Sequence, residues 1–393
     1  MWATFRRFDR YSCRVIARNV TAQGDDATLV AKQLGEKLVA RDLVVVVVFA
    51  DWQVDAAQLA SDLQRILAAP VVGCTAIGVI GEPGETVALG LYGDDLRVGI
   101  GIATELSKHT LARSRDGVER AATMLGLRTE QLDPVRHVAF TLVEGSAQIE
   151  EAFCIGSATA APQLRMVGGV ASTGLDPNSQ ALLGKPVVFA RGEALADAAV
   201  TVVLELSRPY EVITSSHLVP TELKTVVTAA SGRAITELDG IPARHRFEQL
   251  LDKLGGTIDG NKPITYTFAR IVDGVAYVRS IRLIEDQQIM LASAVDAGHV
   301  LRVMRTGNLV EKTELDLAST AKRIGGISAL LAFSCMFRDW EAAKLGIRPA
   351  LATVYGAYPT TGFQSFGEQT GMLFVNHTLT ALAIGGSGGA NGR

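Results

Sequence analysis

Histidine, carboxylate and amide side chains are the groups in this sequence that could bind a ligand or a metal ion. Six histidines offer imidazole nitrogens, and spacing alone selects none of them: His109, His137, His217, His245, His299 and His377. Near the C-terminus, Glu368 and Asn376 lie in the glycine-rich segment GFQSFGEQTGMLFVNHT. On neighbouring strands they could hold a ligand's ammonium group and hydroxyls. They could equally cap turns and brace the last hairpin.

Cysteine could supply a nucleophile or a thiolate ligand. The four cysteines lie far apart with no CxxC pair, which is typical of reduced thiols in a cytoplasmic protein rather than of disulfides or a zinc site. Cys74 and Cys335 stand among small apolar residues, which indicates buried, unreactive thiols. Cys74 as a nucleophile would need a partner base, and none is adjacent in the sequence.

Length and composition limit the class of protein. The 393 residues favour two domains, and 48% hydrophobic residues can supply a core for each. A net charge of −3 without a Lys/Arg cluster argues against a general nucleic-acid or anionic-membrane surface. The longest apolar run, Leu43 to Ala50, is far short of the ~20 residues of a membrane span and predicts a strand buried on both faces. The N-terminal MWATFRRFDRYSC does not have the pattern of a signal peptide, so we expect a cytoplasmic location.

The first half of the sequence contains a repeated pattern. LVVVVVFAD and VAFTLVEG are each followed by an Ala-rich stretch, an AAP step and a strand entering Val-Gly. The same spacing separates Leu43 from Val138 and Val72 from Val167. Each copy continues into a strand-turn-strand segment, with turns at 93–95 and near 191–193. We therefore predict a duplicated β-α-β-hairpin domain over residues 1–206, with copies at about 40–105 and 136–206.

The second half predicts a different, mostly antiparallel α+β domain over residues 207–386. RHRFEQLLDKLG predicts a helix that Gly255-Gly256 ends, and ITYTFARIVDGVAYVRSIRLI predicts a hairpin around Asp273-Gly274. A helix is expected from about Leu309 to Arg323, followed by the buried strand ISALLAFSC and a helix around Phe337 to Leu345. Residues 387–393, rich in glycine, predict a flexible tail.

Several segments together resemble the FIST sensory domains. The closing segment carries Gly367, Glu368, Asn376 and Thr378 in the places of that family's motif. VVGCTAIGVI, MVGGVAS, HLVPTELKTVVTAASGRAITELDGIPA and LAFSCMFRDWEAAKLG agree in order along the chain, from about residue 25 to 386. The resemblance implies N- and C-terminal FIST domains in a ligand-sensing signalling protein rather than a metabolic enzyme.

One branch of that family, the nitric-oxide-sensing NosP haemoproteins, is similar around ITSSHLVPT. It implies a b-type haem, since no CxxCH is present, with His217 as the axial ligand. A second histidine of that branch is replaced here by Ser215 or Ser216. Arg279, Glu368 and Asn376 are the candidate ligand-binding or cofactor-binding residues, with Arg279 paired to a propionate or carboxylate, or else to Glu285 or Glu237. The implied partner is a histidine kinase or a diguanylate cyclase or phosphodiesterase, and a homodimer is possible.

Three functions remain open, of which the resemblance implies the first two. The first is a haem-based sensor of nitric oxide or another diatomic gas. The second is a metal-free FIST sensor of a small metabolite such as an amino acid. The third is an enzyme that uses Cys74 or Glu368. Rivals to His217 as a metal ligand are His377, which could also be a strand or pocket residue without iron, and the thiolates of Cys74 and Cys335; His299 is expected on a surface strand.

Overall fold

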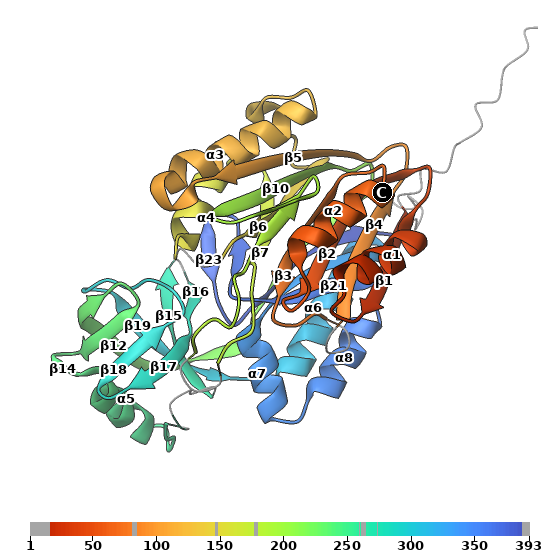
Figure 1. Cartoon of the computed structure of the whole chain (residues 1–393). Coiled ribbons are helices and arrows are strands. Elements are labelled where there is room, and N and C mark those ends of the chain that lie inside the picture. The colour runs from red at the N-terminus through yellow and green to blue at the C-terminus, as the bar shows by residue number, and fades with distance from the viewer. Residues whose placement is uncertain are drawn as a thin grey trace, which may run out of the picture.

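The protein is a mixed α/β structure, which confirms the predicted fold class (Figure 1). The computed structural model describes residues 16–80, 85–145, 148–176, 180–258, 260, 265–272 and 274–386. Within these ranges the strands form four β-sheets. Four features of the sequence lie outside the described residues: the N-terminal segment with Cys13, Ser146 in the expected turn directly after VAFTLVEG, the hairpin residue Asp273 and the tail from residue 387.

The first structural unit is a four-stranded sheet with two helices. It contains β1 (Ile16–Gln23), α1 (Ala27–Leu38), β2 (Leu43–Asp51), α2 (Ala56–Ile66), β3 (Val71–Ala76) and β4 (Glu85–Tyr92), in the strand order β1-β4-β2-β3. Alternate side chains of β2 enter two different cores: Val45, Val47 and Phe49 face one, and Val46, Val48 and Ala50 pack with the helices in the other. The predicted burial of this strand on both faces is therefore confirmed.

The second unit repeats this arrangement. It contains β5 (Arg97–Thr104), α3 (Leu106–Met124), a short 3-10 turn at Thr129–Gln131, β6 (His137–Val143), α4 (Glu150–Ala160), β7 (Arg165–Val170) and β10 (Ala198–Glu205), in the order β5-β10-β6-β7. As in the first unit, the strands on either side of the second helix are parallel, and the unit's last strand, β10, runs antiparallel to both of its neighbours, as β4 does in the first unit.

A third copy of the unit, which the sequence reading missed, is assembled from the C-terminal half. It contains β11 (Tyr210–Ser215), α6 (Leu309–Ile324), β20 (Ile327–Cys335), α7 (Met336–Lys344), α8 (Arg348–Gly356), β21 (Thr360–Ser365) and β24 (Leu379–Gly385), in the order β11-β24-β20-β21. The observed α6 and β20 confirm the expected helix and buried strand. Asn308 caps α6 as Asp26 and Asp55 cap α1 and α2, each side chain accepting a hydrogen bond from the first turn.

Register identifies equivalent positions in the three units. Gly73, Gly168 and Gly362 lie opposite the corresponding residue of the neighbouring parallel strand. A Cβ atom at each would lie 2.2, 2.5 and 2.3 Å from that strand's carbonyl oxygen. Glycine is therefore required at the same place in all three units, because no side chain fits against that backbone.

Each unit also lends a segment to its neighbour. β8 (Val188–Ala190) follows the second unit's β7 but pairs with β3, and is extended by β9 (Glu193–Leu195). β22 (Glu368–Thr370) follows β21 but pairs with β7, and is extended by β23 (Leu373–Val375). Completing the cycle, Val79 after β3 bridges Phe363 on β21. The three units are thus interlocked.

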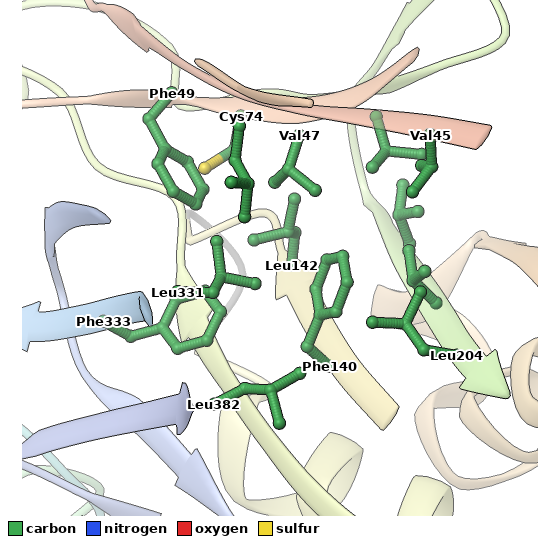
Figure 2. Packing of buried hydrophobic residues seen from close by; sticks show 14 of the residues in the cluster. Val45, Val47, Phe49, Cys74, Phe140, Leu142, Leu204, Leu331, Phe333 and Leu382 are labelled. Carbon is green, nitrogen blue, oxygen red and sulfur yellow. The ribbon is translucent and has the colours of Figure 1, made fainter. Parts of the chain in front are cut away.

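The three sheets share one apolar core. Phe49, Leu142 and Phe333 occupy equivalent positions on β2, β6 and β20, and all are fully buried (Figure 2). The rings of Phe49 and Phe333 are 6.2 Å apart, edge to face, and Phe363 lies 4.6 Å from Phe49. Such interlocked packing holds the three units as one body.

A separate antiparallel body is inserted into the third unit, between β11 and α6. It contains β12 (Leu218–Ser231), β13 (Ala234–Leu238), β14 (Ile241–Pro242), α5 (Ala243–Asp252), β15 (Tyr266–Val272), β16 (Val275–Arg279), β17 (Ile281–Glu285), β18 (Gln288–Leu291) and β19 (Val300–Thr306). Its sheet has the order β16-β15-β19-β12-β13-β18-β17, with β14 on β13, and has its own core around Phe247 and Phe268. In Figure 1 this body lies at the lower left, beside α7.

Of the two predicted hairpins, the one near residues 191–193 is confirmed, because β8 and β9 pair across that turn, and the one around residues 93–95 is wrong. β4 and β5, expected to pair around residues 93–95, lie in different sheets: β4 pairs with β1 and β2, and β5 pairs with β10. The turn residues at 93–95 correctly predict that the chain leaves one strand and begins another there. However, β4 pairs with strands of the first unit and β5 with a strand of the second unit, so the two do not pair with each other. The proposed boundary at residues 206 and 207 stays a prediction.

Candidate functional site

A cavity of about 300 Å³ lies where the second unit, the inserted body and α7 meet. The second unit supplies the start of α4 and the loop after β7, and the insert supplies the β12–β13 turn, β17 and the segment after β18. The lining residues are Gly145, Gln148, Glu150, Leu175, Gln180, Ala181, Leu182, Arg233, Arg282, Ala292, Met336, Phe337, Trp340 and Phe366. We call this space the junction cavity. It lies between bodies with separate cores, where ligand sites commonly occur.

One wall of the junction cavity is aromatic. Met336, Phe337 and Trp340 are spaced so that they share one face of α7, and they approach Phe366 and Leu175 in one apolar cluster. The rings of Phe337 and Trp340 are 5.4 Å apart in an edge-to-face arrangement. Flat apolar surfaces of this kind can contact the side chain of a small ligand.

The opposite side of the cavity carries charge. Arg233 donates a hydrogen bond of 2.6 Å to buried Glu150, whose pKa is raised by burial although Arg233 opposes that shift. Arg282 donates to the carbonyl of Gln180 at 2.9 Å, and burial lowers the pKa of its guanidinium. No ion pair of Arg282 occurs among the residues that the structure describes. A cation in this setting is well placed to bind an anionic group.

A second cluster lies beside the aromatic wall, around Glu341 of α7. The Nε2 atoms of His217 and His377 lie 2.7 and 2.9 Å from the same oxygen, Oε2 of Glu341. All three side chains are buried, with residue exposures of 4%, 2% and 1%. We call this group the His–Glu–His triad.

Three separate segments bring the triad together. His217 precedes β12 at the root of the insert, where its carbonyl accepts a hydrogen bond of 3.0 Å from the amide of Gly307. Glu341 lies on α7. His377 lies between β23 and β24 with a φ of 58°, a left-handed backbone that is uncommon outside glycine and indicates a functional or structural constraint.

The protonation of His217 and Glu341 follows from their burial and hydrogen bonds. Burial lowers the pKa of His217 to about 4, against the effect of Glu341. Burial tends to raise the pKa of Glu341, but the hydrogen bonds from His217 and His377 outweigh it and lower that pKa to about 2. At neutral pH, therefore, Glu341 is a carboxylate and His217 a neutral imidazole.

Glu368 and Asn376 lie in a third buried group. Glu368 is fully buried and accepts hydrogen bonds from Ser365 and Thr378 at 2.5 and 2.6 Å. Burial raises its pKa to about 8, against those hydrogen bonds, so it is a neutral acid at pH 7. The amide atoms of fully buried Asn376 have no hydrogen-bond partner among the described residues.

Arg279 connects the insert to the last hairpin of the chain. Its Nη1 donates to the carbonyl of Phe374 at 3.3 Å, and burial lowers its pKa. Within the described part of the chain it forms no ion pair with Glu285 or Glu237, the partners considered from sequence. His299 is partly buried in a turn before β19. Cys74 and Cys335 are fully buried, as expected, and burial raises the pKa of both thiols.

The structure thus joins some predicted residues and separates others. His217 and His377 are brought onto one carboxylate, whereas Arg279, Glu368 and Asn376 lie around β22 and β23. None of these five residues lines the junction cavity. The sequence reading missed Glu341, Arg282 and the aromatic pair on α7. One feature of the sequence could have indicated Glu341: in FRDWEAAK, Arg338 and Glu341 are three residues apart, which places both charged side chains on one face of a helix.

Helix α7 links the cavity to the triad. Phe337 and Trp340 line the cavity, and the next residue along, Glu341, holds both histidines. The ring of Phe337 also lies 5.9 Å from that of His377. A ligand that shifts α7 would therefore act on the triad and on the root of the insert.

The arrangement around His217 does not fit the axial site of a haem. The side chain of His217 is fully buried, its Nε2 atom is engaged by Glu341, and it is absent from the residues that line the junction cavity. The Nδ1 atom of His217 has no hydrogen-bond partner among the described residues, but a haem ligand also needs space for the porphyrin beside it, and His217 does not border the junction cavity. No step below passes through haem.

Comparison with known proteins identifies the class. The FIST N domain model matches residues 44–241 and the FIST C domain model matches residues 246–370, so this chain belongs to the FIST family. FIST domains are sensory, ligand-binding domains of signalling proteins, which suggests a protein that is not an enzyme. No curated protein matches the sequence. Among the described helices, none combines the length and apolar character needed to cross a bilayer.

Two solved structures are similar over much of their length. Cyanuric acid hydrolase from A. caulinodans is 11% identical, with 95% of this chain and 99% of that chain covered and a TM-score of 0.34. PurLQS from Thermotoga maritima is 10% identical, with 95% and 74% covered and a TM-score of 0.19. Likenesses at this level carry no information on function.

Proposed function

We propose that this FIST protein senses a small carboxylate-bearing metabolite of the amino-acid class, bound in the junction cavity. The observation that carries the proposal is the pairing of a half-buried guanidinium, Arg282, with an aromatic wall on α7, inside a cavity that three parts of the fold share. This is the metal-free alternative of the sequence reading.

The charges of the cavity suit an amino acid. Arg282, which lacks a carboxylate partner among the described residues, would pair with the ligand's carboxylate. Glu150 would accept a hydrogen bond from the ammonium group of the ligand while keeping its ion pair with Arg233. The side chain of the ligand would lie against Phe337 and Trp340. Each ligand group thereby meets a partner of matching chemistry.

Signalling would follow from a shift of α7 and of the insert. A ligand that touches both favours the arrangement in which they close on it, and the free energy available equals its differential affinity for the two arrangements. The family resemblance supports relay to a separate histidine kinase or cyclic-di-GMP enzyme in the cytoplasm, with a homodimer as one possible form. Those partners are part of the proposal.

Thermal unfolding with a panel of amino acids and small carboxylates tests this function. A ligand at 100 times its Kd stabilises the folded state by about 2.7 kcal/mol, enough to raise the melting temperature by several degrees. Arg282→Met should abolish the shift. The matched control, Arg115→Met on the exposed face of α3, should keep it. The proposal would be wrong if no compound of the panel raised the melting temperature, or if the melting temperature of Arg282→Met rose as much as that of the wild type.

The nitric-oxide and haem function stays a separate prediction with its own test. A Soret band in freshly purified protein that moves on addition of nitric oxide, and disappears in His217→Ala, would support it. A colourless protein that takes up no hemin, but is stabilised by a compound of the panel, supports the metabolite sensor.

A further inference from the structure

We propose that His217, His377 and Glu341 form a binding site for one divalent transition-metal ion, distinct from the junction cavity and independent of the function proposed above. The three ligand atoms, two imidazole Nε2 atoms and a carboxylate oxygen, all lie within 4.8 Å of one another. Two imidazoles and one carboxylate are a donor set that proteins use for zinc and for non-haem iron(II).

The distances are close to those of a coordinated ion. Donor atoms bound at about 2.0–2.2 Å to one metal lie roughly 3 Å apart when adjacent. The two observed N···O separations are 2.7 and 2.9 Å. Two donors bound to one ion at these bond lengths lie at most about 4.4 Å apart, and the three atoms here lie within 4.8 Å of one another, so an ion would enter with small rotations of all three side chains.

Binding requires a change of tautomer at the imidazoles. In the metal-free arrangement both Nε2–H groups donate to one oxygen of Glu341. When each imidazole carries its proton on Nδ1 instead, the two Nε2 lone pairs face the ion together with the carboxylate. The second oxygen, Oε1 of Glu341, has no hydrogen-bond partner among the described residues and could complete bidentate binding.

The surroundings limit both the metal and its affinity. The nitrogen donors favour Zn²⁺, Co²⁺ and Fe²⁺ over Mg²⁺ and Ca²⁺, which prefer oxygen. Arg338 is fully buried nearby, on the same helix as Glu341, where it donates a hydrogen bond to Thr313. The positive charge of its guanidinium repels the metal ion and so weakens its binding. We therefore expect a site weaker than a structural zinc site formed by thiolates.

Position gives the ion a structural role. The ligands come from the root of the insert, from α7 and from the β23–β24 connection, segments more than a hundred residues apart for His217 and Glu341. A bound ion would tie these segments together. Because α7 also forms the aromatic wall, the ion would hold that wall in place whether or not a ligand occupies the cavity.

The test is Co²⁺ and Zn²⁺ binding to the whole protein without a histidine tag, stripped of metal with a chelator. We expect one Co²⁺ per chain, seen as visible d–d absorption that an equivalent of Zn²⁺ removes. We also expect Zn²⁺ to raise the melting temperature. His377→Ala and Glu341→Gln should each weaken Zn²⁺ binding by about 100-fold or more, since each removes one of three ligands. His245→Ala, at an exposed position on α5, should leave it unchanged.

Several results would overturn the proposal. The wild-type protein would bind neither Co²⁺ nor Zn²⁺ at one equivalent, or His377→Ala and Glu341→Gln would bind Zn²⁺ as tightly as the wild type does. If a triad variant fails to fold, wild-type stoichiometry and the Zn²⁺-dependent rise in melting temperature still decide the matter. Arg282→Met distinguishes this site from the metabolite site, because it should lose the metabolite response and keep the metal.

Discussion

Glu368 should make the stability of the protein depend on pH in a way that Glu368→Gln removes. Its pKa rises from 4.5 to about 8 because the side chain is fully buried. The folded state therefore holds the proton more tightly than the unfolded state, so the stabilising effect is complete below about pH 4.5 and is lost as the pH rises toward 8. Each pKa unit corresponds to about 1.4 kcal/mol, so between pH 5 and pH 8 this one group should cost about 3–4 kcal/mol.

Glutamine preserves the shape and hydrogen bonds of the protonated acid. Ser365 and Thr378 can each donate or accept, so one can donate to the amide oxygen and the other accept from the amide nitrogen. Glu368→Gln should therefore have nearly wild-type stability at pH 5. At pH 8 it should be more stable than the wild type by about 3–4 kcal/mol, because it has no proton to lose.

Urea unfolding followed by circular dichroism at pH 5 and pH 8 measures this difference. Glu36→Gln, at an exposed position on α1, is the matched control and should show a difference of less than about 0.5 kcal/mol at either pH. If Glu368→Gln and wild type differ by the same amount at both pH values, Glu368 is not a buried neutral acid, and our description of this group is wrong.

Three further predictions concern the fold and the cavity. Gly362→Ala places a Cβ atom 2.3 Å from the carbonyl oxygen of Ala332 and should destabilise the protein by about 3 kcal/mol. The control, Gly356→Ala, has open space around the new Cβ atom and should stabilise the protein by about 0.5–1 kcal/mol. Equal urea midpoints for the two variants would contradict the threefold register. Trp340→Phe should remove the change in tryptophan fluorescence on ligand binding while binding persists by calorimetry; an unchanged signal would place the ligand elsewhere. Asn376→Ala should change stability by less than about 1 kcal/mol, because its amide has no partner among the described residues; a loss above about 2 kcal/mol in urea unfolding would show that it braces the hairpin.

The sequence predicted local structure well and missed part of the architecture. The Val-rich β2 and the β20 segment were identifiable because apolar runs bounded by turn residues are typical of buried strands. The repeat was found for two units because their glycines, Gly73 and Gly168, recur at constant spacing. Gly362 marks the third unit, but the insert between β11 and α6 breaks the spacing, so periodicity could not reveal it.

The candidate site was less predictable for a physical reason. His217 and Glu341 are distant in sequence and meet only because the insert returns its chain to the start of α6. The cavity depends on the packing of three parts of the fold, namely the second unit, the insert and α7, which no local pattern encodes. Burial also determines the state of Glu368, and burial follows from β22 joining the second unit's sheet, a pairing far from local in sequence.

Ligand-observed NMR of the purified protein with a pool of the common amino acids tests the central claim most directly. The account predicts saturation-transfer signals from at least one amino acid with wild-type protein, lost in Arg282→Met and retained in Arg115→Met. It would be contradicted if no amino acid in the pool gave a signal with the wild type, or if Arg282→Met gave the same signals as the wild type.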